Sequence, residues 1–309
     1  MQSETFTTMA ADGTPLHTFR WVPQRQAKAI VQIAHGMAEH AARYERFAAA
    51  LTAAGYAVYA NDHRGHGGTH PVGRGHGYFA DRDGFATVVD DMRAVTEVAR
   101  AENPDLPVFL FGHSMGSFLA RAYAARFGSE LAGLVLSGTA GDQGVLGKVG
   151  LGLALAEARV RGRHHVSPLL DSMSFGQYGK AFKPTRTKFD WLSRDEAEVD
   201  KYVADPLCGN VFTAGFFVDL IRGLNHIHDP ATTAKVPADL PIHLMAGSMD
   251  PVGAQTKGVD QVAAQYRKAG VAQVTTRYYL GGRHELLNET NRDEVTADLI
   301  GWLDAHLPA

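Results

Sequence analysis

The stretch from Pro107 to Phe118 constrains the fold of this chain most strongly. Its residues 108–111 are all apolar and predict a buried strand, and a helical run over 117–127 follows closely. Between strand and helix stands the pentapeptide Gly112-His113-Ser114-Met115-Gly116. In this setting, a serine with glycine at both second neighbours is typical of the tight turn that presents a nucleophile. We therefore interpret Ser114 as a nucleophile rather than as an incidental residue of a glycine-rich turn.

Strand and helix signals alternate on both sides of this stretch. Residues 5–9 and 16–21 flank Asp12-Gly13 and predict a hairpin. Buried strands are predicted over 29–34, 56–60, 132–136, 242–246 and 273–280, and helices over 39–54, 85–101, 259–268 and 292–306. The alternation predicts an α/β fold with a mostly parallel central sheet flanked by helices. Functional residues are expected on loops at the carboxyl ends of the strands.

The alternation stops between residues 140 and 235, which predicts an inserted, mostly helical cap. The catalytic domain then comprises residues 1–139 and 236–309. Within the cap, residues 211–224 place apolar side chains on one wide helical face. Most of that face is expected to pack on the core. We assign Phe212, Phe216 and Phe217 to the entrance of a site for an apolar substrate, because a cap over an active site offers such a surface.

Composition narrows the partners and the compartment. The formal net charge of −3 gives no basic footprint for nucleic acid. The single cysteine, Cys208, excludes an intrachain disulfide and fits a reducing compartment; we interpret it as a small buried side chain rather than a reactive thiol. The N-terminal residues lack a signal-peptide pattern, and the chain contains no apolar run long enough to span a bilayer. We expect a cytoplasmic protein whose contact with membranes is at most peripheral.

A serine nucleophile needs a base, and the base needs a third group that holds its tautomer. Where the nucleophile lies on a turn of this kind, the acid and then the histidine follow it in the chain, each after a later strand. Asp250 follows the predicted strand 242–246, and His284 follows the predicted strand 273–280. A turn-forming role for Asp250 and a helix cap for His284 are the ordinary alternatives. Order and placement together favour a triad of Ser114, Asp250 and His284.

The tetrahedral intermediate also needs backbone donors. One is expected to be the N–H of Met115, directly after the nucleophile, and the other an N–H in the loop after strand 29–34. We assign the second donor to Met37, with Gly36 letting the chain turn close to the substrate. His35 precedes that turn, so we expect it to form structural hydrogen bonds rather than to act as a base.

Several motifs together resemble the monoacylglycerol lipase and lysophospholipase branch of the α/β-hydrolases. They are His-Gly-Met-Ala-Glu-His-Ala-Ala-Arg-Tyr (35–44), Asn-Asp-His-Arg-Gly-His-Gly (61–67), Gly-His-Ser-Met-Gly-Ser (112–117), Gly-Ser-Met-Asp-Pro-Val (247–252) and Gly-Gly-Arg-His-Glu-Leu-Leu-Asn-Glu (281–289). The resemblance implies the same triad and oxyanion donors, a helical cap over an acyl tunnel, and no cofactor. The better-known monoacylglycerol lipases have small residues where this chain has Met37-Ala38, a departure that bears on the alcohol half of the substrate.

Other chemistries fit less well. Histidines gather at 63–76, 164–165 and 226–228, but the ligand spacing of a hydrolytic zinc is missing, so we expect no catalytic metal. Haloalkane dehalogenases and epoxide hydrolases require an aspartate at position 114. A prolyl-type aminopeptidase needs an acidic cluster in the cap to hold a free amine, and one is formed by Asp195, Glu196, Glu198 and Asp200. Such a run is more typical of a solvated helix face.

The sequence therefore predicts a serine hydrolase that cleaves carboxylic esters with one medium or long acyl chain through an acyl-enzyme intermediate. Monoacylglycerols and lysophospholipids are the expected substrates. A small-ester carboxylesterase and the aminopeptidase are the enzyme alternatives. The non-enzyme alternative is a ligand-binding protein, although such proteins typically lose a triad member. The expected partner is a small lipid ester, with reversible contact between the cap and a membrane or micelle surface; the sequence predicts no oligomeric state.

Overall fold

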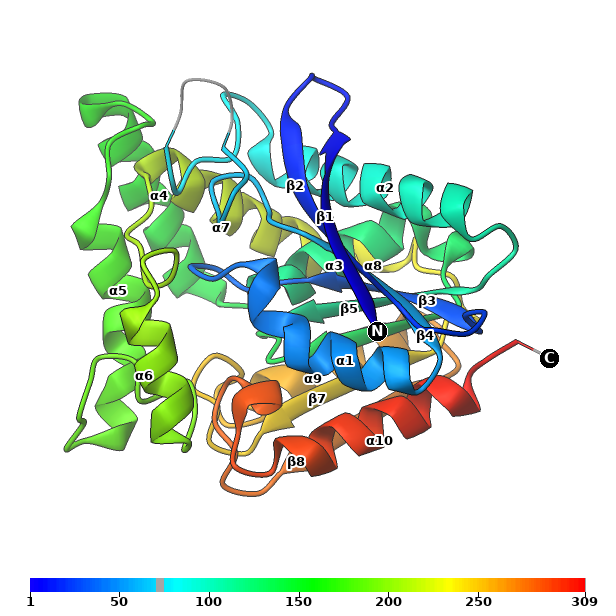
Figure 1. Ribbon diagram of the computed structural model, residues 1–309. Coiled ribbons are helices and arrows are strands. Elements are labelled where there is room, and N and C mark those ends of the chain that lie inside the picture. The colour runs from blue at the N-terminus through cyan, green and yellow to red at the C-terminus, as the bar shows by residue number, and fades with distance from the viewer. Residues whose placement is uncertain (71–74, 309) are drawn as a thin grey trace.

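Eight strands form one sheet in the order β1-β2-β4-β3-β5-β6-β7-β8 (Figure 1). The computed structural model describes residues 1–70 and 75–308, apart from the side chain of Phe175. The strands are β1 (Gln2–Met9), β2 (Pro15–Val22), β3 (Ala29–Ala34), β4 (Tyr56–Asn61), β5 (Val108–His113), β6 (Gly133–Ser137), β7 (Ile242–Gly247) and β8 (Val274–Tyr279). The β1–β2 hairpin joins β4 in antiparallel fashion, and the pairs from β4 to β8 are parallel.

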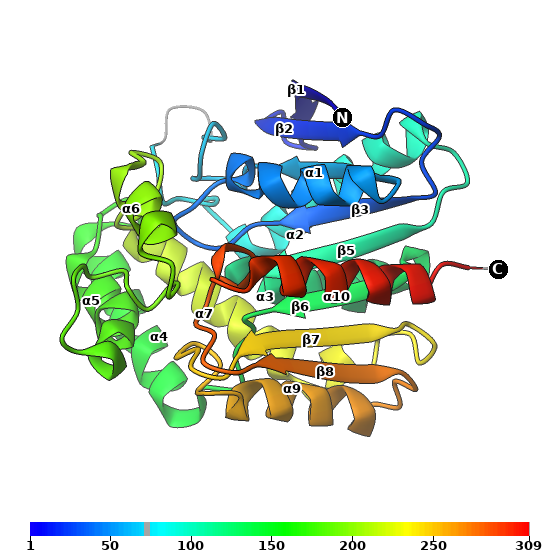
Figure 2. The same ribbon diagram turned by 60° about the horizontal axis from the view of Figure 1, so that its bottom comes forward.

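Helices cover both faces of this sheet, as the buried strand runs require. The central strands β3, β5, β6 and β7 are buried at every residue. One face packs on α1 (Glu45–Ala53) and α10 (Arg292–Ala305) through side chains such as Phe47 and Leu299 (Figure 2). The other face packs on α2 (Gly84–Glu102), α3 (Met115–Phe127) and α9 (Lys257–Lys268). The predicted α/β-hydrolase type of architecture is confirmed.

The segment between β6 and β7 is helical. It contains α4 (Gly144–Arg161), α5 (Pro168–Tyr178), α6 (Glu196–Ala204), α7 (Ala214–His228) and α8 (Pro230–Thr233). Capping residues start four of them, because Ser167, Asp195, Thr213 and Asp229 accept hydrogen bonds from first-turn N–H groups of α5, α6, α7 and α8. Helices α4, α5 and α6 stand beyond the carboxyl ends of the strands, whereas α7 contacts α2, α3 and α4 (Figures 1 and 2). The division into residues 1–139, 140–235 and 236–309 stays a prediction.

Two of the predicted helices near Ser114 begin at other residues in the structure. The helix predicted over 39–54 starts as a short 3-10 turn over Ala41–Tyr44 before α1 begins at Glu45. The helix predicted over 117–127 begins at Met115, directly after Ser114. Helix α6 begins within the acidic run that was interpreted as a solvated helix face, whereas α4, α5 and α8 had no helix predicted at their positions. Part of the predicted glycine- and histidine-rich loop, residues 71–74, lies outside the described residues.

Candidate active site

Ser114 lies in the tight turn between β5 and α3. Its backbone has φ 51°, a left-handed conformation that a non-glycine residue adopts only where the surroundings hold it. The Ser114 N–H donates to the Ser137 carbonyl at 2.9 Å, which anchors the turn to the neighbouring strand β6. A Cβ on Gly112 would lie 2.5 Å from the Gly116 carbonyl oxygen, and a Cβ on Gly116 would clash with the Ala34 carbonyl. Both glycines are therefore required by backbone contact.

Asp250 and His284 come together from the loops after β7 and β8. Each carboxylate oxygen of Asp250 lies 3.0 Å from Nδ1 of His284. The side chain of Asp250 is fully buried and that of His284 is 2% exposed, so solvent does not compete for this interaction. The structure thus brings together the two predicted partners of Ser114, and all three follow carboxyl ends of adjacent or nearby parallel strands.

Two histidines near Ser114 have opposite pKa shifts. Burial alone lowers the pKa of His284, but the Asp250 carboxylate and its hydrogen bond outweigh burial, so the pKa lies above 6.5. The pKa of His113 falls to about 4, because burial and the neighbouring His284 both disfavour its cation. The two rings are 4.7 Å apart between centroids. When the surroundings shift the pKa values of two nearby groups in opposite directions, the two groups take different acid–base roles. His284 is therefore the candidate base, and His113 is a neutral neighbour.

The cavity at Ser114 is small. Its lining includes both predicted residues of the oxyanion loop, together with His284 and three residues of the segment between β6 and β7: Gly36, Met37, Trp191, Leu192 and Tyr202. Its volume is about 10 Å³, room for no more than about one water molecule. The described part of the chain therefore shows no acyl tunnel at Ser114, and the tunnel that the resemblance implies stays a prediction. Met115, the other predicted donor, is the first residue of α3, where helix N–H groups are free of helical partners.

Phe212, Phe216 and Phe217 lie in the core. Their side chains are 1%, 0% and 3% exposed, and none lines the cavity at Ser114. Phe212 and Phe216 pack against each other and against His66, with ring centroids 4.3 to 6.0 Å apart. The assignment of these three phenylalanines to a substrate entrance stays a prediction.

Hydrogen bonds fix the loop after β3. His35 behaves as expected: its Nε2 accepts from the His63 N–H at 2.9 Å, and its Nδ1 lies 2.7 Å from the Gly36 carbonyl oxygen. Ala38 has φ 59°, and its carbonyl accepts from the Tyr202 hydroxyl at 2.7 Å and from the Gly209 N–H at 2.9 Å. The residue next to Met37 is thus held by two donors from the segment between β6 and β7.

A buried ionic network joins the same loop to the histidine loop. Glu39 accepts from the Gly36 N–H at 2.6 Å and from the Tyr44 hydroxyl at 2.8 Å. Arg43 contacts Glu39 at 2.5 Å and binds Glu285 through two contacts of 2.7 Å. Burial by itself would raise the pKa of Glu39, but the Arg43 guanidinium and other neighbours outweigh burial and lower the pKa to about 2. Arg43 thereby connects Glu39, in the loop of Met37, with Glu285, the residue after His284.

We expect Arg43→Met to destabilise the fold by about 3–5 kcal/mol at neutral pH, because two buried carboxylates lose their counter-charge. The pKa of Glu39 is depressed in the folded protein, so its stabilisation is present at neutral pH and is lost as pH falls towards 2. The deficit of the variant should therefore shrink in acid. Urea unfolding at several pH values measures it.

Arg126→Met is the matched control. The Arg126 side chain is 39% exposed and pairs at 2.5 Å with Asp90, whose side chain is 50% exposed, a surface contact that we expect to contribute at most about 1 kcal/mol. Equal losses of stability in the two variants would contradict a special role for the buried network.

The acidic cluster that an aminopeptidase requires is engaged elsewhere. Asp195 caps α6 and pairs with Arg292 at 2.6 Å, and Asp200 pairs with Arg186 at 2.6 Å. None of the four acidic residues lines the cavity at Ser114. The structure therefore gives the cluster a structural role at the start of α6.

The sequence analysis did not predict three residues that line the cavity at Ser114, namely Trp191, Leu192 and Tyr202. The Trp191 ring lies 5.1 Å from the His284 ring, and the backbone of Trp191 and Leu192 accepts from the N–H groups of His284 and Glu285 at 3.4 Å and 2.7 Å. Two large apolar residues just before the cap of α6 were a weak signal for this contact. Glu39 and Arg43 stood in the quoted motif 35–44, but their partners lay too far along the chain to be inferred.

Comparisons with known proteins agree with this geometry. The family described as serine aminopeptidase, S33, matches residues 25–291. A monoacylglycerol lipase of Mycolicibacterium smegmatis is 30% identical over 93% of this chain and 92% of its own length. The human monoglyceride lipase is 30% identical over 78% of this chain and 71% of its own. A thermostable carboxyl esterase of Bacillus coagulans, crystallised with glycerol, superposes with a TM-score of 0.92 at 29% identity over the full length of both chains.

Proposed function

This chain belongs to the α/β-hydrolase family described as serine aminopeptidase, S33, and within it to the branch that resembles monoacylglycerol lipases. From this we propose that it is a serine hydrolase of carboxylic esters with a single acyl chain. The observation that carries the proposal is the buried Asp250–His284 pair beside Ser114, in one cavity with the loop of Met37. The relatives named above include two lipases of monoacylglycerols, which supports esters with one acyl chain as substrates.

In the proposed mechanism, Ser114 attacks the ester carbonyl while His284 takes the hydroxyl proton. Asp250 holds the tautomer of His284 and stabilises the imidazolium that forms. The N–H groups of Met37 and Met115 bind the oxyanion, and each such donor typically contributes ~2.7–4 kcal/mol to transition-state stabilisation. His284 then protonates the leaving alcohol and activates the water that hydrolyses the acyl-enzyme. Met115 is well placed for this because the N-terminus of α3 favours negative charge.

The experiment is a panel of esters. Rates are measured on p-nitrophenyl esters from acetate to palmitate, on a 1-monoacylglycerol and on lysophosphatidylcholine, with Ser114→Ala as the blank. We expect activity to rise with acyl length and to require Ser114. Activity confined to the acetate would favour a small-ester carboxylesterase. Cleavage of proline amides without any ester hydrolysis would favour the aminopeptidase, and no turnover at all would favour a binding protein.

An apolar surface on α4 and α5 supports reversible contact with lipid. Along α4, the side chains of Val145, Leu146 and Val149 are 74%, 78% and 53% exposed, and Leu169 and Met173 on α5 are also exposed. The same helix α4 carries Lys148, Arg159 and Arg161 against one acidic residue, Glu157. An apolar face with a basic rim is typical of a helix that lies on an anionic membrane. None of the described helices is long and apolar enough to cross a bilayer.

We expect the double variant Leu146→Glu with Val149→Glu to bind anionic phospholipid vesicles at least tenfold more weakly, since two apolar contacts are replaced by charges that anionic lipid repels. Hydrolysis of soluble p-nitrophenyl acetate should be unchanged. Leu280→Glu is the control, because Leu280 is 91% exposed at the end of β8. Co-sedimentation with vesicles measures the binding, and equal loss in both variants would argue against docking through α4.

A further inference from the structure

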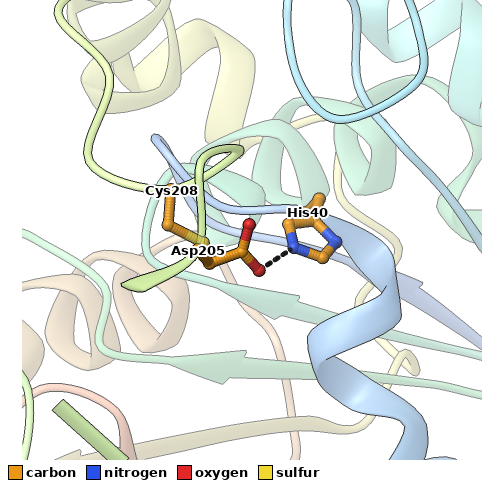
Figure 3. Close-up of side chains that lie close together, drawn as sticks. All are labelled: His40, Asp205 and Cys208. Carbon is orange, nitrogen blue, oxygen red and sulfur yellow. Dashed lines mark hydrogen bonds and ion pairs between the residues drawn. The ribbon is translucent and has the colours of Figure 1, made fainter. Parts of the chain in front are cut away.

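His40, Asp205 and Cys208 converge where the loop after β3 meets the turn after α6 (Figure 3). His40 is 8% exposed, and its Nε2 lies 2.8 Å from Oδ2 of Asp205. The ligand atoms of all three residues lie within 4.8 Å of one another. His40 and Asp205 are 165 residues apart in the chain, so the spacing of residues in the sequence could not predict the cluster.

The local backbone holds two of the donors in one tight turn. The Cys208 N–H donates to the Asp205 carbonyl at 3.0 Å, and the Leu207 N–H donates to Oδ1 of Asp205 at 2.9 Å. The second carboxylate oxygen is thereby directed at His40. The next residue, Gly209, donates to the Ala38 carbonyl at 2.9 Å, which fixes this turn against the loop that carries His40.

We propose that His40, Asp205 and Cys208 form a binding site for a thiophilic divalent cation, Zn²⁺ or Co²⁺, distinct from the catalytic residues. Imidazole, carboxylate and thiolate together suit these ions, whereas Mg²⁺ and Ca²⁺ prefer oxygen ligands alone. With metal–ligand distances of about 2.0–2.3 Å, tetrahedral donors stand roughly 3.3–3.8 Å apart. On that scale the widest donor pair, at most 4.8 Å apart, has to close by about 1 Å, and the His40–Asp205 pair, 2.8 Å apart, has to open by about 0.5 Å. A three-ligand site leaves the fourth position to water.

Binding replaces a proton. A thiol has to lose its proton to become a metal ligand, so binding of the cation at Cys208 releases a proton. Affinity should consequently increase with pH. The bound cation then links the turn after α6 to the loop that supplies Met37.

The test uses cobalt as a spectroscopic probe on the whole chain, with the thiol kept reduced. The chain contains one cysteine, so any thiolate-to-cobalt charge-transfer absorption comes from Cys208. We expect a band that saturates at one Co²⁺ per chain, disappears on addition of Zn²⁺, and is missing in Cys208→Ser. Asp205→Asn and His40→Gln should each weaken the affinity at least tenfold. His226→Gln, at an exposed histidine near the end of α7, is the control and should bind as the wild type does.

Two results would overturn the proposal. One is the lack of a charge-transfer band in the wild type. The other is a band whose affinity is unchanged in Asp205→Asn, because the thiol would then bind without its neighbours. Asp205 lies in a partly exposed turn, so this variant decides the matter even where His40→Gln fails to fold. Zn²⁺ should also raise the melting temperature of the wild type and not that of Cys208→Ser. Neither readout depends on ester hydrolysis.

Discussion

Ser114→Ala should lower kcat for ester hydrolysis by a factor on the order of 10⁶, leaving a residual rate of roughly 10³–10⁴ over the reaction in water. The nucleophile is lost, while the oxyanion donors and the substrate contacts stay in place. Burst kinetics with a p-nitrophenyl ester should vanish together with turnover, since no acyl-enzyme can form. Ser117→Ala is a close control: its buried hydroxyl donates to the Ser114 carbonyl at 2.5 Å, and its loss should cost less than tenfold.

A companion variant separates chemistry from folding. Ser114→Gly should be as inactive as Ser114→Ala. Its free energy of unfolding should nevertheless exceed that of the wild type by about 1 kcal/mol, because glycine adopts φ 51° without strain. Inactive variants that are also destabilised would point to a folding defect. Wild-type rates in either variant would remove Ser114 from the mechanism.

Asp250→Asn should lower the plateau of kcat by about 10⁴, because the amide favours the wrong tautomer of His284. It should also change the pH profile. In the wild type, kcat/KM falls as the pH drops through the pKa of His284, which Asp250 holds above 6.5. Without that charge, burial is opposed only by the smaller effects of Glu285 and Glu39, so the pKa of the imidazole falls. The acidic limb of the variant should therefore move to lower pH.

Rate profiles from pH 4 to 9 on one soluble ester measure this shift. Asp260→Asn serves as the control, since Asp260 accepts from the Tyr278 hydroxyl on an exposed face of α9 and should leave the profile unchanged. An acidic limb that stays in place, or moves to higher pH, would contradict the assignment of Asp250 as the partner of His284.

The candidate catalytic residues could be selected from the sequence because their signals are local. Ser114, Asp250 and His284 each follow a predicted strand, and turn chemistry marks each position within a few residues. The sheet was equally accessible, since buried parallel strands are continuous apolar runs. The helix after Ser114 was also predicted, and only its first residue differs, because α3 begins at Met115 rather than at Ser117.

The surroundings of the site could not be predicted in the same way. Tyr202 reaches Ala38 across 164 residues, and nothing near Tyr202 in the chain indicates that partner. Phe212 and Phe216 show the converse difficulty, because an apolar helical face looks the same whether it meets a substrate or the core. Helix α5 is started by a capping residue and lacks strong apolar periodicity, which explains why the pattern did not predict it.

The two hydrogen bonds on the Ala38 carbonyl have a kinetic consequence. They make the orientation of the Met37 N–H depend on the position of α6 and of the turn at Gly209. The cavity at Ser114 has room for no more than about one water molecule, so every ester has to displace this segment before it reaches Ser114. A longer acyl chain requires a larger displacement, and in the proposed mechanism the Met37 N–H is aligned again only when the segment returns. Acyl length is therefore expected to act on the rate of acylation itself, and not on binding alone.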